Sequence, residues 1–120
     1  MIKITVLYNL PPGTDEDEFI RWRTTTHHEA NISRPGVIRA DFYRIIGTPL
    51  LGPERPASPT APYRFITEAY YDDYESFEQS WNDPEEQARL LPAVAKIIDS
   101  VFLISEEFQT FVAEIEFMSS

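Results

Sequence analysis

Hydrophobic and polar residues alternate in four stretches of the chain and follow a helical spacing between them. Alternation at every second residue predicts strands at residues 2–8, 37–46 and 63–71 and from about residue 101 onward. The helical spacing predicts helices at about 15–32, 72–81 and 83–99. We expect Thr14 or Asp15 to cap the first helix, and Asp83 followed by Pro84 is typical of another helix start. The predicted order of elements is βαββαβ.

This order is typical of a ferredoxin-like α+β fold, in which an antiparallel four-stranded sheet carries its helices on one face. The strand at 63–71 has aromatic residues on both sides, with Phe65 and Tyr71 on one side and Tyr70 on the other. This distribution indicates that neither face of the sheet is fully solvated. We therefore expect a second copy to cover the face without helices, so that a homodimer forms a dimeric α/β barrel.

The residues after the fourth predicted strand alternate once more. Phe111, Ala113, Ile115 and Phe117 fall on one side of this tail, and Val112, Glu114 and Glu116 fall on the other. We expect residues 107–117 to form a C-terminal strand extension that joins a sheet edge, above all that of the partner subunit. Packing of the tail on the helices of its own subunit is the alternative. The length of the chain predicts one domain over residues 1–120.

Composition and charge narrow the range of partners. The formal net charge is −10 with only 10 Lys and Arg residues, whereas nucleic-acid binding requires a dense basic surface. The chain has no cysteine, which excludes disulfides and thiolate chemistry. It has no apolar run near the ~20 residues of a membrane span, and its first residues alternate like a strand rather than a targeting segment. We expect a cytoplasmic protein that binds a small molecule and a second copy of itself, and no nucleic acid or membrane.

A proline-rich segment separates the second and third predicted strands. Prolines recur at 53, 56, 59 and 62, with the three-residue step of a polyproline II helix. Because the segment lies between two strands, we expect residues 47–62 to form a stiff loop. Two other interpretations are a ligand for a polyproline-binding module and a lid over a pocket.

The only two histidines, His27 and His28, are adjacent in the first predicted helix. Neighbouring helical positions diverge by ~100°, and the chain has no further histidine to complete a familiar ligand set, so we expect no metal site. If Phe19, Thr26 and Ala30 form the buried stripe, His27 flanks the core and His28 faces solvent. His27 is therefore the candidate acid/base group, because an unperturbed imidazole titrates near neutral pH. A structural, hydrogen-bonded histidine is the alternative.

Five further residues are candidates for the wall of a substrate pocket. They are Tyr8, Tyr43, Arg44, Tyr71 and Trp81. Tyrosine and arginine near strand ends combine an aromatic wall with hydrogen-bond donors for an enolate or phenolate oxygen. Trp81 also has the helical spacing of a core residue, which is the competing interpretation for it. The chain has no nucleophile elbow and no phosphate-binding glycine loop, so we expect no bound cofactor.

Ordered stretches of the sequence resemble EthD-like proteins of the dimeric α/β-barrel superfamily. The stretches are MIKITVLY, PPGTDEDEF, a helix histidine followed by RPGV, FYRIIGTP, APYRFITEAYYDDYESFEQSW, DPEEQARLLPAV and VFLISE. They cover nearly all of residues 1–108, and methylmuconolactone isomerases and REDY-like proteins of pigment biosynthesis share the outline. The resemblance implies a homodimer with a pocket between sheet and helices in each subunit. It also implies a histidine eight residues before Pro35, which is His27, although His28-Glu29-Ala30 replaces the apolar residue and Pro-Leu pair of the family.

Resemblance and helix geometry together predict an enzyme of secondary metabolism or aromatic degradation. We expect cofactor-free acid/base chemistry on an oxygenated aromatic, polyketide-like or lactone substrate, as in an isomerase, decarboxylase, cyclase or oxygenase. His27 would move the proton, and Tyr8, Tyr71 or Arg44 would hold the developing oxyanion. The alternative is a non-catalytic EthD-like accessory protein that binds a hydrophobic small molecule for a partner enzyme.

Overall fold

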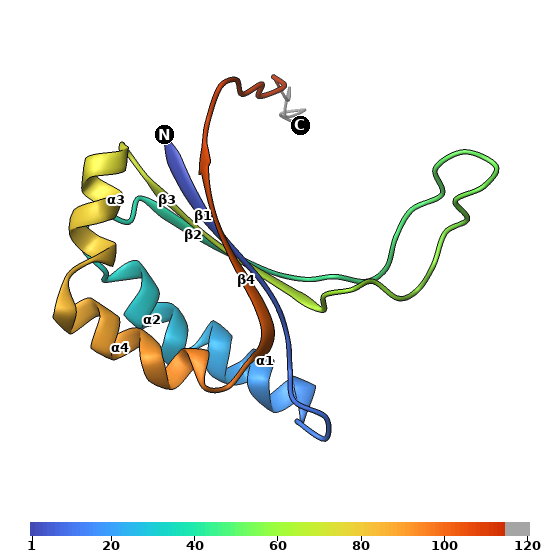
Figure 1. The fold of residues 1–120 in the computed structure, drawn as a ribbon, viewed down its shortest axis with the longest axis horizontal. Coiled ribbons are helices and arrows are strands. Elements are labelled where there is room, and N and C mark those ends of the chain that lie inside the picture. Colours follow the sequence, from blue (N-terminus) through green and yellow to red (C-terminus); the bar gives the residue numbers. More distant parts are fainter. Residues whose placement is uncertain (115–120) are drawn as a thin grey trace, which may run out of the picture.

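The structure, a computed structural model, describes residues 1–114, which form one sheet with four helices on one of its faces (Figure 1). The strands are β1 (Ile2–Asn9), β2 (Arg39–Arg44), β3 (Phe65–Tyr71) and β4 (Ile98–Glu106). The helices are α1 (Glu16–Thr24), α2 (Thr26–Ile32), α3 (Tyr74–Trp81) and α4 (Pro84–Val94). This arrangement confirms the predicted ferredoxin-like α+β fold.

The strands lie in the order β2-β3-β1-β4, and every neighbouring pair is antiparallel. The central strand β1 places Ile4 between Ala69 of β3 and Ile104 of β4. The fourth strand begins at Ile98 rather than near residue 101, because the pairing shifts between Leu7 and Asn9 of β1 and lets Asn9 pair with Ile98. Alternation alone does not reveal such an irregularity in the register.

The first helical region is broken, which corrects the prediction of one helix over 15–32. Asp15 caps α1 as expected and accepts a hydrogen bond of 3.1 Å from the Glu18 N–H. At Thr25 the backbone leaves the helical region (φ −115°, ψ −88°), and the Thr24 and Thr25 hydroxyls donate to the Ile20 and Arg21 carbonyls. Threonine hydroxyls that bond to the preceding turn compete with the helix and bend it. The helix therefore restarts as α2 with a different phase.

Two clusters of buried side chains lie between the sheet and the helices. The first contains Ile2, Ile4, Tyr71 and Phe77, and the second contains Tyr8, Phe19 and Phe65. Alternate residues of β1 and β3 belong to these clusters, as the strand period of two requires. The restart of the helix moves Thr26 and Ala30 to the surface, so the predicted buried stripe is wrong beyond Phe19.

The other side of the sheet carries no helix among residues 1–114, and we call it the bare sheet face. Three rows of paired residues cross it: Tyr43-Ile66-Leu7-Val101, Asp41-Glu68-Thr5-Leu103 and Arg39-Tyr70-Lys3-Ser105. The first row is entirely apolar or aromatic. Lys3 pairs with Glu68 at 2.9 Å and Arg39 with Asp41 at 3.0 Å, so the rest of the face mixes apolar residues with compensated charges.

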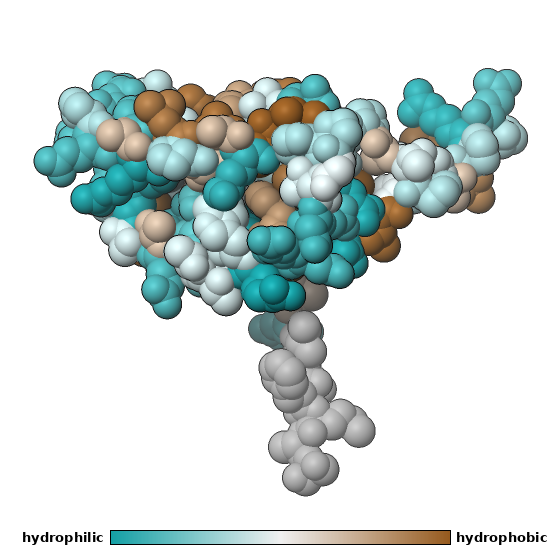
Figure 2. Space-filling view, turned by 90° about the horizontal axis from the view of Figure 1, so that it is seen from below, coloured by the Kyte–Doolittle hydropathy of each residue, from teal (hydrophilic) through white to brown (hydrophobic). Residues whose placement is uncertain are grey.

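The proline-rich segment projects from the sheet as a long loop between β2 and β3 (Figure 1). We call residues 46–62 the proline arm. Near its base, Thr48 and Ser58 exchange backbone hydrogen bonds of 2.7 and 3.0 Å. Arg64 holds the base by donating to the Ile45 carbonyl at 3.0 Å and to Glu16 at 2.8 Å. Figure 2 shows the arm projecting away from the globular body. Hydrophobic side chains reach the surface along one side of that body.

Replacing Gly47 with alanine is expected to open the base of the proline arm. Gly47 has φ +150°, and a Cβ atom there would meet the backbone carbonyl of Ser58. We expect hydrogen exchange of the Thr48 and Ser58 amides to accelerate roughly tenfold or more, as measured by NMR. Gly52→Ala is the control, because Gly52 also has positive φ (+70°) but faces open space. Equal acceleration in both variants would show that backbone strain, rather than the close approach, governs the arm.

The tail leaves the sheet after β4. The Glu107 N–H still donates to the Met1 carbonyl at 3.0 Å, but residues 107–114 form no strand, and Phe108 and Phe111 are almost fully exposed. The predicted extension is therefore not formed over 107–114 within the single chain, and Phe108 and Phe111 do not pack on its helices. Ile115 and Phe117 lie outside the described residues. Pairing of the tail with a partner's sheet edge stays a prediction.

Candidate functional site

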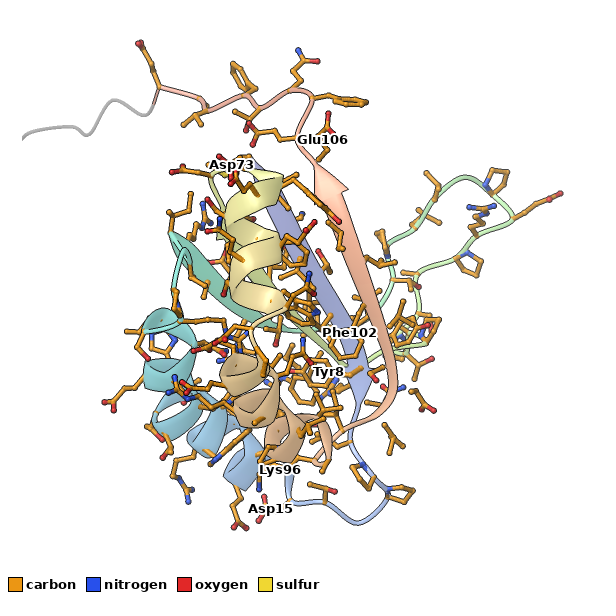
Figure 3. The ribbon with its side chains drawn as sticks, turned by 60° about the vertical axis from the view of Figure 1, so that its left-hand side comes forward. Tyr8, Asp15, Asp73, Lys96, Phe102 and Glu106 are labelled. Carbon is orange, nitrogen blue, oxygen red and sulfur yellow. The ribbon has the colours of Figure 1, made fainter. Side chains whose placement is uncertain are left out.

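A cavity of about 90 Å³ lies between the sheet and the helices. Val6 and Tyr8 of β1, Trp22 of α1, Trp81 of α3, Val94 of α4 and Phe102 of β4 contribute to its mainly aromatic and apolar wall. Figure 3 shows Tyr8 and Phe102 between the sheet and the helices. Ligand sites for drug-sized molecules are commonly ~300–1,000 Å³, so this cavity suits a compound with a single ring.

His27 of α2 contributes an imidazole to this cavity. Its ring stacks on Trp22 with centroids 4.7 Å apart and an angle of 21° between the planes. Burial, together with the smaller effect of the positive charges of Arg23 and Arg34, lowers the pKa of His27 to about 4. His27 is therefore a neutral proton acceptor at pH 7. His28 does not line the cavity, but it is half-buried rather than fully solvent-facing as predicted.

Tyr8 supplies a phenol on the opposite wall, near the end of β1. Its ring stacks on Phe65 at 5.7 Å and meets the edge of Phe19 at 6.2 Å. The Tyr8 hydroxyl shares a hydrogen bond of 2.9 Å with Thr67 Oγ1. Burial raises the pKa of Tyr8, so this hydroxyl keeps its proton at neutral pH and is available as a hydrogen-bond donor.

Arg23 is the cavity residue that the sequence analysis missed. It is only 3% exposed, its guanidinium lies 4.7 Å from the Phe42 ring centroid, and its Nη2 is 3.5 Å from Thr67 Oγ1. The arginine remains cationic although burial lowers its pKa. A usable signal was present, because Arg23 follows the core residue Phe19 by four residues within α1, which is the spacing of one helix face.

A second arginine, Arg34, follows α2 and also reaches the cavity. Its guanidinium lies 5.9 Å from the Trp81 ring centroid. Glu86 of α4 faces it at 3.5 Å and binds Arg89 at 2.9 Å on its other oxygen. Glu86 is itself buried, so the charge of Arg34 is compensated inside the protein.

The structure brings together three of the six predicted site residues, namely His27, Tyr8 and Trp81. Tyr71 is fully buried in the core and packs edge-on against Phe77 at 5.3 Å. Tyr43 lies on the bare sheet face, 49% exposed. Arg44 pairs with Glu16 at 3.2 Å, away from the cavity. Strand parity and position along the strand separate these residues from the cavity, although all of them lie near strand ends.

Two other expectations concern what surrounds the cavity. No residue of the proline arm lines it, so the arm is not a lid over the cavity of its own subunit. Within residues 1–114, no three His, Asp or Glu side chains gather in the arrangement of a metal site. Among the same residues, no helix has the length and hydropathy needed to cross a bilayer.

Comparisons with known proteins agree with this architecture. The sequence profile of the EthD domain matches residues 11–100. An EthD family protein from Bacillus halodurans is 26% identical with a TM-score of 0.67, over 89% of this chain and 98% of that chain. A dimeric ferredoxin-like protein from Thermobifida fusca (16% identity, TM-score 0.57) is matched over 87% of this chain and 88% of its own. SnoaB, a cofactor-independent oxygenase from Streptomyces nogalater (14% identity, TM-score 0.60), is matched over 91% and 94%. None of the curated proteins compared is a significant match.

Proposed function

Because this chain belongs to the EthD domain family and encloses a neutral histidine in an aromatic cavity, we propose that it is an enzyme of cofactor-free acid/base chemistry. The substrate is an oxygenated aromatic or lactone molecule of about one ring. The observation that carries the proposal is His27, whose unprotonated imidazole is stacked on Trp22 at the cavity wall. SnoaB supports it only through the fold, since the same architecture houses a cofactor-independent oxygenase there.

The proposed chemistry begins with removal of a proton next to a substrate carbonyl. The C–H proton passes to the free nitrogen of His27, the C–H electron pair forms a C=C bond, and the π electrons of the carbonyl move onto its oxygen to give an enolate. The Tyr8 hydroxyl, which already shares a hydrogen bond with Thr67, is the neutral donor placed to stabilise this oxygen. Isomerisation, decarboxylation, cyclisation and oxygenation can all pass through an enolate of this kind, so the proposal covers the shared step.

We also propose that the active form is a homodimer built on the bare sheet face. The apolar row Tyr43-Ile66-Leu7-Val101 crosses all four strands without a covering element among residues 1–114. A contiguous apolar patch of this kind is typical of an interface. The cavity lies on the helix side of the sheet, so each subunit retains its own site.

One observation favours a second candidate function, a non-catalytic protein that binds a hydrophobic small molecule for a partner enzyme. With a pKa of about 4, His27 is a weak base. A base that weak abstracts protons only from acidic carbon or after its pKa has risen on ligand binding. The accessory role therefore predicts binding without proton transfer.

Replacing His27 with alanine is expected to abolish proton transfer in the cavity. The assay follows deuterium incorporation into 2-coumaranone, in which one benzene ring is fused to a five-membered lactone with an acidic C–H, by NMR in D2O. The wild-type protein should accelerate incorporation, and His27→Ala should reduce the acceleration by about 10²-fold or more, which is the usual contribution of a general base.

His28→Ala is the matched control, because His28 is the adjacent imidazole and does not line the cavity. The rate of deuterium incorporation with His28→Ala should stay within about twofold of the rate with the wild-type protein. Saturable quenching of tryptophan fluorescence by 2-coumaranone without any acceleration would support the accessory role instead. Equal losses in both variants would contradict the assignment of His27.

A further inference from the structure

The cavity contains a positive charge, Arg23, that no acidic residue in the described part of the chain compensates. Arg23 is 3% exposed, and no Asp or Glu side chain among residues 1–114 forms an ion pair with it. Its polar partners are two neutral hydroxyls, Thr67 Oγ1 at 3.5 Å from Nη2 and the hydroxyl of Tyr8, although a guanidinium has five N–H donors. This isolation occurs in a chain with 20 acidic residues and a formal charge of −10. Burying a charge without a partner costs several kcal/mol.

The other charges near the cavity do not supply the missing partner. Glu86 is engaged by Arg34 and Arg89. Glu68 also borders the cavity, but its side chain lies on the bare sheet face, where Lys3 binds its carboxylate at 2.9 Å. Thr67 and Tyr8 beside Arg23 are neutral and offer hydroxyl groups. Of the two arginines that line the cavity, Arg34 is therefore paired with Glu86, and Arg23 has only neutral hydroxyl groups and aromatic rings beside it among residues 1–114.

We propose that the cavity selects anionic substrates, with Arg23 binding a carboxylate on a single aromatic ring. This inference rests on the proposed function, because it assigns the substrate class of the same cavity. The planar fork of a guanidinium matches the two oxygens of a carboxylate. The ring of the ligand occupies the aromatic part of the cavity, beside the Trp22 and His27 rings. The Tyr8 and Thr67 hydroxyls share one hydrogen bond, so one O–H of the pair stays free to donate a further hydrogen bond to the anion.

An anionic ligand on Arg23 is also expected to raise the pKa of His27. The charged groups nearest His27 are Arg23 from α1 and Arg34 after α2, while Glu86 of α4 faces Arg34 and Tyr8 of β1 stays neutral. A carboxylate on Arg23 offsets one of the two positive charges that depress the histidine pKa. Binding of the anion therefore raises the pKa of His27 and makes it a stronger base when the substrate is present.

Three isosteric ligands test the charge preference: benzoate, benzamide and benzamidinium. Affinities are measured at pH 7 by isothermal titration calorimetry. We expect benzoate to bind the wild-type protein at least about tenfold more tightly than benzamide, as one charge-assisted pair implies, and benzamidinium to bind weakest. In Arg23→Met the benzoate advantage should be lost while the benzamide affinity stays within about threefold. Arg23→Lys should retain part of the preference.

The control is Arg21→Met, which removes an exposed arginine two residues away on the same helix. It should leave all three affinities unchanged, because an exposed charge at that position is screened by solvent. Arg23→Met is expected to fold, since methionine replaces a buried charge with an apolar side chain of similar length. Circular dichroism checks this directly. In the wild type, NMR titration should show benzoate raising the His27 pKa above about 4, whereas benzamide should not.

Several outcomes would overturn the inference. The first is that the wild-type protein binds benzoate and benzamide with equal affinity. The second is that none of the three ligands binds at 10 mM, a dissociation constant that corresponds to roughly −2.7 kcal/mol. The third is that Arg23→Met and Arg21→Met lose benzoate affinity to the same extent. Failure of the proposed function is distinguishable from these. A benzoate preference that depends on Arg23, without deuterium exchange that depends on His27, would leave the anion site standing and remove the acid/base role.

Discussion

Replacing Leu103 with glutamate is expected to convert the proposed homodimer into a monomer at micromolar concentration. Leu103 lies on the bare sheet face, opposite Thr5 of β1, and is 46% exposed in the single chain. In a two-fold symmetric interface each substitution occurs twice, so two carboxylates replace two leucines. Burying them would cost several kcal/mol, and the charge of −10 on each chain adds repulsion. We expect the dimer dissociation constant to rise by roughly 100-fold or more.

Sedimentation velocity at protein concentrations between about 1 and 50 μM measures this equilibrium. Dissociation constants in that range correspond to association free energies of about −8 to −6 kcal/mol. Leu91→Glu is the matched control, because it introduces the same change from leucine to glutamate at an exposed position of α4, on the helix side of the sheet. It should leave the dimer intact. A wild-type monomer at these concentrations, or equal effects of both substitutions, would contradict an interface on the bare sheet face.

A chain that ends after Glu107 separates the tail from this face in the same experiment. If the tail pairs with the partner's sheet edge, its removal should weaken association steeply. If association is unchanged, the bare sheet face accounts for the dimer by itself. The exposure of Phe108 and Phe111 in the single chain is the reason to make this comparison.

Replacing Phe65 with alanine is expected to lower the free energy of unfolding by about 3–5 kcal/mol. Phe65 of β3 is 0% exposed and contacts three other rings: Tyr8 at 5.7 Å, Phe42 at 5.6 Å and Phe19 at 5.3 Å. Its removal leaves a void behind the wall that carries Tyr8, and dense packing on every side prevents the void from closing. The loss is a large share of the total stability of a small domain.

Urea unfolding at one fixed protein concentration measures this loss, because association contributes to the apparent stability of a dimer. Leu91→Ala is the control, since it removes an exposed side chain and alanine favours a helix. The change for this control should stay within about 0.5 kcal/mol. A comparably small change for Phe65→Ala would mean that the ring cluster collapses onto the space left by Phe65.

The order and type of the elements were predictable because the sequence encodes them locally. Alternation marked β1, β2 and β3, and the helix starts at Asp15 and Asp83 follow from side-chain oxygens that accept the Glu18 and Glu86 N–H groups. Both signals act within a few residues and need no tertiary partner. The ferredoxin-like fold follows from the order of elements, since few topologies accommodate it. The choice of His27 over His28 as the cavity residue also came from local spacing and resemblance.

Packing between distant segments decided the rest. The break at Thr25 reset the phase of α2, so the predicted stripe of Thr26 and Ala30 is exposed while His27 still reaches the cavity. A prediction from helical periodicity assumes one continuous helix, so it cannot indicate where the phase changes. Tyr71 and Arg44 lie on the helix side of the sheet like Tyr8, yet their positions along the strands place them in the core and at the arm base.

Arg23 shows the physical reason most clearly. The sequence alone identifies an arginine with helical spacing to Phe19 and His27, but a charged side chain on a surface helix ordinarily reaches solvent. Its burial depends on Phe42 from β2 and Thr67 from β3, which are far away in the chain and meet Arg23 only when the sheet has formed. Whether an acidic residue also reaches it is set by the same assembly. Local patterns therefore determined the elements, whereas the packing of those elements formed the cavity and left Arg23 without an acidic partner among residues 1–114.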